Sequence, residues 1–120
     1  MSSIEALIEE LRVFADTRDW AQFHSLRNLV LALVGEVGEL AAELQWVPDE
    51  DVFDHLNDQD KRDSFESELA DVATYLLRIC DIASVDLASV IRKKMALNET
   101  RYPVEKSKGS SAKYDNLSES

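Results

Sequence analysis

The sequence predicts an all-α protein with four helices in one domain, for three reasons. The chain has 120 residues, which is the usual size of a single domain. It contains only 3 glycines and 2 prolines, so residues that interrupt helices are scarce. Apolar residues recur at helical spacing along most of the chain, and the alternating pattern of a half-buried strand is absent.

The first three helices are separated by polar breaks. The first is predicted from Ile4 to about Ala15, and the break DTRDWAQF follows it. The second is predicted from about Ser25 to Gln45. Its apolar stripe consists of Leu26, Val30, Leu33, Val37, Leu40 and Leu44. The acidic break VPDEDVFDHLNDQD, which Pro48 opens, precedes a third helix from about Lys61 to Ala83.

A fourth helix is predicted after the sequence SVD. Ser84 or Asp86 offers its N-cap, because a short side-chain oxygen can accept a hydrogen bond from the first turn. The helix continues to about Arg101 and ends before Pro103. An apolar content of 45% supports a modest core in a chain of this length, which we expect self-association to complete.

Composition narrows the class of protein further. Residues 1–103 are expected to form the folded domain, and the polar, serine-rich segment 104–120 is expected to be a disordered tail. A net charge of −11 argues against binding to a nucleic-acid polymer, because the phosphate backbone is also negative. The apolar runs are too short for a membrane span, no signal peptide is recognisable, and Cys80 is the only cysteine. A cytoplasmic protein is the simplest reading.

Two pairs of acids border the apolar stripes of the long helices. Glu36 and Glu39 are three residues apart in the second helix, and Glu68 and Asp71 are three apart in the third. Residues at this spacing share a helix face. If the two helices pack antiparallel, all four carboxylates converge, and their mutual repulsion is relieved by a hard divalent cation such as Mg²⁺. From the pattern alone, a solvated acidic face and a metal site both remain open.

The second helix also carries Gly35 and Gly38, which form a smooth face together with Ala42. A glycine inside a helix costs about 1 kcal/mol relative to alanine. That cost is tolerable where another backbone packs closely, so we expect a structural role for these two glycines.

The acids stand in a longer pattern that resembles a known family. EVGE, a spacer and ELAD resemble the E-x-x-E…E-x-x-D signature of the all-α nucleoside triphosphate pyrophosphohydrolases, the MazG-like superfamily. The segments RDW, FH, RN, QW and KM…N…RYP look like those of its dCTP pyrophosphatase branch. The resemblance covers roughly residues 4–103. The acidic spacer does not look like a shared motif.

The resemblance implies a Mg²⁺-dependent enzyme, with Mn²⁺ as a substitute ion, that cleaves a (deoxy)nucleoside triphosphate to the monophosphate and pyrophosphate. The substrate would be dCTP or a modified dCTP, and the role would be house-cleaning of the nucleotide pool. Homodimers or homotetramers with sites between protomers are also implied. The implied metal ligands are Glu36, Glu39, Glu68 and Asp71. Glu39 is our choice for the general base that takes the proton of the attacking water.

Other residues are implied as substrate contacts. Near the end of the fourth helix, the candidates for phosphate or sugar are Lys94, Asn98 and Tyr102. The candidates for a pocket around the base are Trp20, His24 and Trp46. Tyr75, one turn after Asp71, either lines the same cavity or packs in the core.

Two other classes of function stay open at this stage. One is a non-catalytic helical protein that acts in oligomerisation or as an adaptor, for which the acids would be spread over exposed faces. The other is a related all-α hydrolase that acts on dUTP or phosphoribosyl-ATP. The tryptophan and histidine around residues 20–24 argue against the second alternative.

Overall fold

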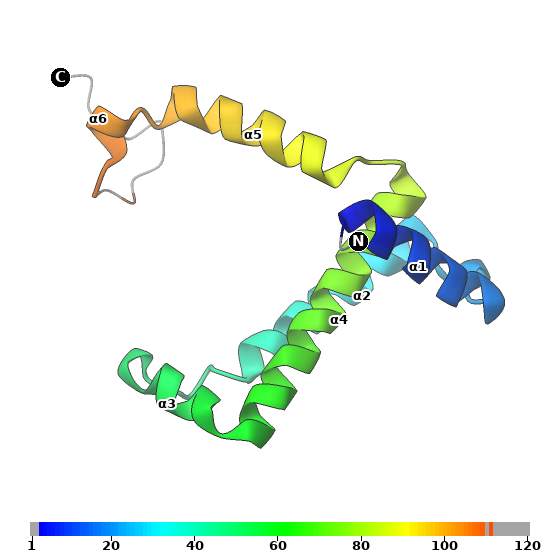
Figure 1. Ribbon diagram of the computed structural model, residues 1–120, viewed down its shortest axis with the longest axis horizontal. Coiled ribbons are helices and arrows are strands. Elements are labelled where there is room, and N and C mark those ends of the chain that lie inside the picture. The colour runs from blue at the N-terminus through cyan, green and yellow to red at the C-terminus, as the bar shows by residue number, and fades with distance from the viewer. Residues whose placement is uncertain (1–2, 110, 112–120) are drawn as a thin grey trace. The chain divides into compact units, whose positions relative to one another are not determined.

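A computed structural model describes residues 3–109 and 111, and these residues form helices and no strands (Figure 1). The four predicted helices are confirmed. They are α1 (Ile4–Thr17), α2 (Leu26–Ala42), α4 (Gln59–Ala83) and α5 (Leu87–Arg101). None of these described helices combines the length and the apolar character that a membrane crossing requires.

Each long helix begins at a side chain that caps it. The hydroxyl of Ser3 accepts a hydrogen bond from the backbone N–H of Ala6 at 3.0 Å, and Ser25 accepts one from Asn28 at 3.1 Å. Asp58 caps α4 in the same way. These bonds satisfy backbone donors that have no partner inside the helix.

The start of α5 settles the choice between the two predicted caps. Asp86 is the N-cap of α5, and its carboxylate accepts from the N–H of Ser89 at 3.1 Å. Ser84 instead ends α4 in a left-handed conformation, with a φ of 55°. Ser84 therefore ends α4, and Asp86 begins α5.

The acidic break between α2 and α4 is more ordered than the sequence predicts. A 3-10 turn, η2 (Asp49–Asp51), and a short helix, α3 (Val52–Asn57), occupy it. Pro48 stands at the N-cap of the turn, and acids in a first turn interact favourably with the helix dipole. Val52 and Leu56 are half-buried, and α3 contacts α4. This tertiary packing stabilises a helix that the polar sequence alone does not predict.

Helices α2 and α4 lie side by side and antiparallel, as predicted (Figure 1). Close pairs of residues show the direction. His24, just before α2, lies beside Arg78 near the end of α4. Glu36 and Glu39, further along α2, lie beside Glu68, which is earlier in α4. Residue numbers therefore rise along one helix as they fall along the other, which brings the acids of both together.

The core of the described residues is small. Only Ala15, Leu29 and Cys80 are buried apolar residues, whereas Val34 is 67% exposed and Phe53 is 81% exposed. A side chain added at Gly35 or Gly38 would meet no other atom within 4 Å, so the glycine face of α2 has no close neighbour in the described chain. The predicted close packing against these glycines is absent within one copy of the described chain.

The described residues from Asp86 onward belong to a second compact unit, which contains α5 and a short helix, α6 (Val104–Ser107). The hydroxyl of Ser107 donates to the backbone carbonyl of Pro103 at 2.6 Å. Residues 104–107 of the predicted disordered tail therefore form a helical turn. Pro103 is its N-cap, and the hydrogen bond from Ser107 to Pro103 stabilises it. Residues 110 and 112–120 of that segment lie outside the described residues.

Candidate functional site

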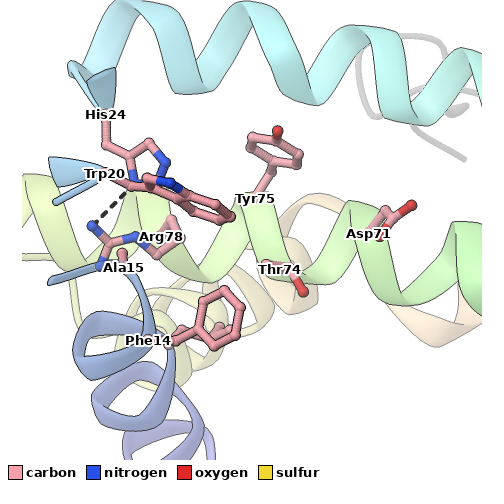
Figure 2. Close-up of a pocket in the computed structure, with 9 residues that line it drawn as sticks. Phe14, Ala15, Trp20, His24, Asp71, Thr74, Tyr75 and Arg78 are labelled. Carbon is pink, nitrogen blue, oxygen red and sulfur yellow. Dashed lines mark hydrogen bonds between the residues drawn. The ribbon is translucent and has the colours of Figure 1, made fainter. Parts of the chain in front are cut away.

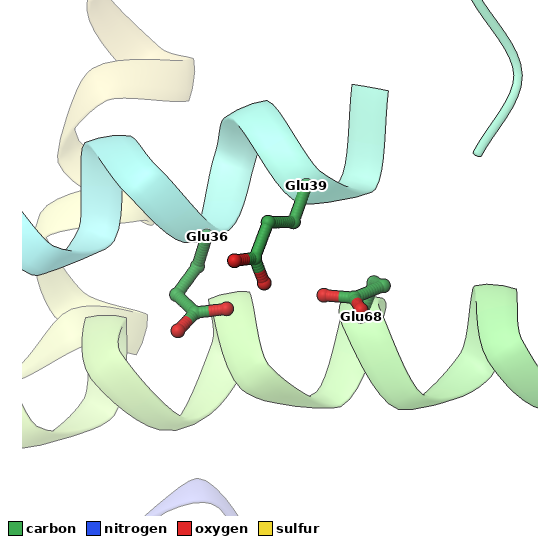
Figure 3. Close-up of side chains that lie close together, drawn as sticks. All are labelled: Glu36, Glu39 and Glu68. Atoms are coloured by element: carbon green, nitrogen blue, oxygen red, sulfur yellow. The ribbon is translucent and has the colours of Figure 1, made fainter. Parts of the chain in front are cut away.

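Three of the four predicted acids meet between α2 and α4. One carboxylate oxygen from each of Glu36, Glu39 and Glu68 lies within 4.8 Å of the other two. Figure 3 shows the two side chains of α2 directed toward the side chain from α4. One oxygen of Glu36 and one of Glu68 are buried and have no hydrogen-bond partner in the described chain. We call these three residues the acidic cluster.

The electrostatics of the acidic cluster are unfavourable without a cation. Burial raises the pKa of Glu36, and the negative charges of Glu39 and Asp71 raise it further. The pKa of Glu68 is raised by burial and then by its contact with Glu39 and by Asp71. Orphaned buried oxygens on converging carboxylates are the donor set that a hard divalent cation takes in proteins. The residues present therefore fit a metal ion.

A neutral side chain at position 36 should stabilise the metal-free protein. The pKa of Glu36 in the folded state lies above its ordinary value of 4.5. At a pH between the ordinary pKa and the raised pKa, the folded protein therefore binds more protons than the unfolded protein. Stability therefore falls as pH rises through that window. We expect Glu36→Gln to melt at a higher temperature than the unmodified protein at pH 7, and we expect the difference to shrink toward pH 4.

Thermal melts in the presence of a chelator measure this effect. Glu10→Gln on α1 is the matched control, because Glu10 is exposed and lies outside the acidic cluster. An equal gain in both variants, or no gain in Glu36→Gln, would contradict strain among the carboxylates.

Asp71, the fourth predicted ligand, lies one helical turn beyond Glu68 on α4. It is not part of the acidic cluster, although its charge contributes to the raised pKa values of Glu36 and Glu68. Its side chain lines a neighbouring cavity. Asp71 therefore connects the acidic cluster to that cavity.

The cavity has a volume of about 380 Å³, which is at the small end of the range for ligand sites. We call it the aromatic cavity (Figure 2). Its lining comes from α1, from the segment around η1 (Ala21–Phe23), and from α4. The lining residues are Leu11, Phe14, Ala15, Trp20, His24, Asp71, Thr74, Tyr75 and Arg78. Three predicted contacts, Trp20, His24 and Tyr75, are thus brought together.

A tight turn after α1 places Trp20. Asp19 adopts a left-handed conformation, with a φ of 54°, and the backbone N–H of Trp20 then donates back to the carbonyl of Ala15 at 3.0 Å. The indole meets the ring of Phe14 edge to face, with 5.7 Å between centroids. The guanidinium of Arg18 lies 3.6 Å from the centroid of the same phenyl ring. The ring of Phe14 therefore contacts both Trp20 and Arg18, while Trp20 itself stays 45% exposed.

Arg78 is a residue at the cavity that the sequence analysis did not identify. It is only 4% exposed, and it donates to Asp81 at 2.9 Å and to Nδ1 of His24 at 3.4 Å. Arg12 on α1 also binds Asp81, through two nitrogens at 3.0 and 2.7 Å. These cations hold the pKa of Asp81 below its usual range. A signal was present, since Arg78 follows Asp71 and Tyr75 on one face of the helix at intervals of four and three.

The remaining predicted contacts lie elsewhere. Trp46 is 88% exposed and is not among the residues that line the aromatic cavity. Lys94, Asn98 and Tyr102 belong to the second unit, with Lys94 and Asn98 on α5 and Tyr102 at its C-cap. Lys94 and Asn98 are four residues apart, so they share a face of that helix. The roles of these four residues stay predictions.

The described helices thus place an acidic cluster beside an aromatic cavity, an arrangement suited to a metal ion and a ligand with a flat ring. Residues 32–117 match the MazG-like family, and the chain belongs to this family. The resemblance seen in the sequence is thereby confirmed.

Individual relatives are similar over most of the chain. It is 44% identical to the dCTP pyrophosphatase 1 of Bos taurus over 119 residues, which are 96% of this chain and 70% of that protein. The dCTP pyrophosphatase 1 of Homo sapiens is 42% identical over the same shares of the two chains. The crystal structure of a pyrophosphatase from Archaeoglobus fulgidus superposes with a TM-score of 0.78 at 35% identity, and the match covers 86% of this chain and 94% of that one.

Proposed function

We propose that this chain is a nucleotide pyrophosphohydrolase that cleaves dCTP, or a modified dCTP, to the monophosphate and pyrophosphate. One observation carries the proposal: the acidic cluster and the aromatic cavity adjoin through Asp71, in a chain whose relatives are named dCTP pyrophosphatases. A nucleoside triphosphate needs both halves of such a site. Its base needs flat apolar walls, and its phosphates need compensation of their negative charge.

Mg²⁺ is the proposed cofactor, with Mn²⁺ as a substitute, and Glu36, Glu39, Glu68 and Asp71 would hold it. When bound, such an ion neutralises phosphate charge and lowers the pKa of a coordinated water. Glu36 and Glu68 contribute the buried, unpartnered oxygens. Glu39 is the more exposed member of the acidic cluster, and it remains our choice for the base that accepts the proton of the water attacking the α-phosphorus.

The aromatic cavity is the proposed base pocket. Trp20 offers an indole face for stacking, Tyr75 lines the side formed by α4, and His24 contributes a hydrogen-bonding ring. Trp46 is proposed as a further wall of the base site. Lys94, Asn98 and Tyr102 are proposed for the phosphates or the sugar, because ammonium, amide and phenol groups hydrogen-bond such oxygens.

A homodimer or homotetramer is the proposed form of the protein in solution. The support is the small core, the many exposed apolar side chains and the open glycine face of α2. The cytoplasmic location and the house-cleaning role predicted from the sequence stay predictions.

Alanine at Gly35 or Gly38 should distinguish an open helix face from an interface. On an open face each change strengthens α2 by about 1 kcal/mol. At an interface the added methyl group separates the two backbones, and we expect the oligomer to dissociate more readily. Sedimentation over a range of concentrations measures this. An unmodified chain that is monomeric at micromolar concentration would contradict the proposed assembly.

An adaptor without catalytic activity is the competing function. An adaptor function does not explain why one oxygen of Glu36 and one of Glu68 are buried without a hydrogen-bond partner among the described residues. A panel of nucleoside triphosphates with Mg²⁺, scored by the phosphates released, separates the two functions. We expect pyrophosphate release, fastest with dCTP or a modified dCTP. Equal inactivity on every nucleotide would support the adaptor, and preference for dUTP would identify the related hydrolase.

A further inference from the structure

Arg78 occupies a buried position from which it reaches only a few groups. One terminal nitrogen donates to Asp81, the other lies 3.4 Å from Nδ1 of His24, and Nε has no partner among the described residues. Asp81 is in turn held by Arg12. The guanidinium is therefore fixed at the end of α4, with one edge directed at the imidazole of a cavity residue (Figure 2).

The chemistry of this contact determines the state of His24. A guanidinium has five N–H donors and no acceptor, so the ring nitrogen that faces it must accept. Nδ1 of His24 therefore carries no proton, and the neutral ring carries its proton on Nε2. A proton on Nδ1 would set one N–H against another and one positive charge against another.

The surroundings of His24 favour the same neutral state. The pKa of His24 is lowered by burial and then by the positive charge of Arg78. The charged or titratable groups that line the same cavity are Arg78, Tyr75 and Asp71, all on α4. Asp81 forms ion pairs with both Arg78 and Arg12 of α1. No carboxylate among the described residues is hydrogen-bonded to the imidazole, so none stabilises its protonated form.

We propose that Arg78 is a positioning residue that sets base specificity, by holding His24 as the tautomer that accepts at Nδ1 and donates from Nε2–H. The proposal rests on the nucleotide function proposed above. Nε2 is the ring nitrogen that Arg78 does not contact, and His24 lines the aromatic cavity, so the proposal gives this cavity a donor of fixed type. It then selects a base that presents an acceptor there, such as the unprotonated ring nitrogen N3 of cytosine, over one that presents an N–H, such as N3–H of uracil.

Nitrogen NMR of the histidine rings tests the tautomer without nucleotide or metal. The chain has two histidines, so His55 serves as an internal reference. We expect Nδ1 of His24 to be unprotonated and Nε2 to be protonated at pH 8, and we expect this state to persist to a lower pH than in an ordinary histidine, because the pKa of His24 is lowered. In Arg78→Met we expect mixed tautomers and titration of His24 at a higher pH than in the unmodified protein. A proton on Nδ1 in the unmodified protein, or an unchanged spectrum in Arg78→Met, would overturn the proposal.

Arg12→Met is the matched control. It removes a cation from the same Asp81 but makes no contact with His24, so the spectrum of His24 should stay that of the unmodified protein. Arg78→Lys keeps a charge and donors in a similar volume, and partial retention of the tautomer in this variant supports the assignment even if Arg78→Met does not fold. A change as large in Arg12→Met as in Arg78→Met would indicate a merely structural role and overturn the proposal.

Nucleotide binding supplies the second readout. We expect Arg78→Met to lose roughly tenfold in affinity for dCTP at pH 7, which is the usual scale for one hydrogen bond, and to acquire a pH dependence that Arg12→Met lacks. The terminal phosphate titrates alike in both variants and so cancels from the comparison. An equal pH dependence in the two variants would overturn the specificity role. Binding of no nucleotide by any variant, with the expected NMR tautomer, would instead refute the proposed function and leave the state of His24 supported.

Discussion

Replacing Glu68 by glutamine is expected to reduce turnover of dCTP on the order of 100-fold while the helices stay intact. Glu68 supplies a buried oxygen that no described residue satisfies, and the substitution removes its charge with little change of shape. The same loss is expected for Glu36→Gln, Glu39→Gln and Asp71→Asn. Steady-state kinetics with excess Mg²⁺, combined with circular dichroism, measures activity and fold together.

Glu66→Gln is the matched control for these variants. Glu66 lies on α4 two residues before Glu68, but its side chain is exposed and paired with Arg62 at 3.0 Å. An exposed ion pair contributes little to stability, so its loss should leave activity and fold nearly unchanged. Full activity in two of the four acid variants would refute the assigned metal site.

Truncation of Trp20 to alanine is expected to weaken binding of dCTP by about 1–3 kcal/mol, if the base stacks on the indole as bases do in single-strand binders. The loss should appear mainly in KM, because stacking acts on the ground state and the transition state alike. Trp20 is 45% exposed, so the melting temperature should fall only modestly.

Phe53→Ala provides the comparison for Trp20→Ala, since Phe53 is an aromatic residue on α3 that is 81% exposed and outside the aromatic cavity. We expect its nucleotide affinity to match that of the unmodified protein. A collapsed melting temperature with unchanged affinity in Trp20→Ala would make the tryptophan structural and remove the base pocket from this cavity.

The long helices were predictable because each carries its own local information. Periodic apolar residues mark their length, and Ser25 and Asp86 mark their starts. The short helix α3 was not predictable in this way. Pro48 and a run of acids indicate a break, whereas contacts of Val52 and Leu56 with the rest of the fold, chiefly α4, stabilise the helix.

The acidic cluster was predictable for a similar reason, since the spacing of three residues places Glu36 and Glu39 on one face of α2, toward α4. Arg78 was missed because its contact with the cavity residue His24 joins positions that are distant in sequence. His24 is separated from it by 54 positions, and Arg12 is separated from Asp81 by 69. The spacing of Arg78 from Asp71 and Tyr75 marks a shared helix face, but it does not indicate which distant residue Arg78 contacts.

The most direct test of the proposed activity is hydrolysis of dCTP in water enriched in oxygen-18, followed by phosphorus NMR of the products. We expect dCMP and pyrophosphate in equal amounts, with the label on dCMP, since the water is proposed to attack the α-phosphorus. A chelator should stop the reaction, and Mg²⁺ should restore it. Release of inorganic phosphate, label on pyrophosphate, or turnover that persists without divalent metal would contradict the account.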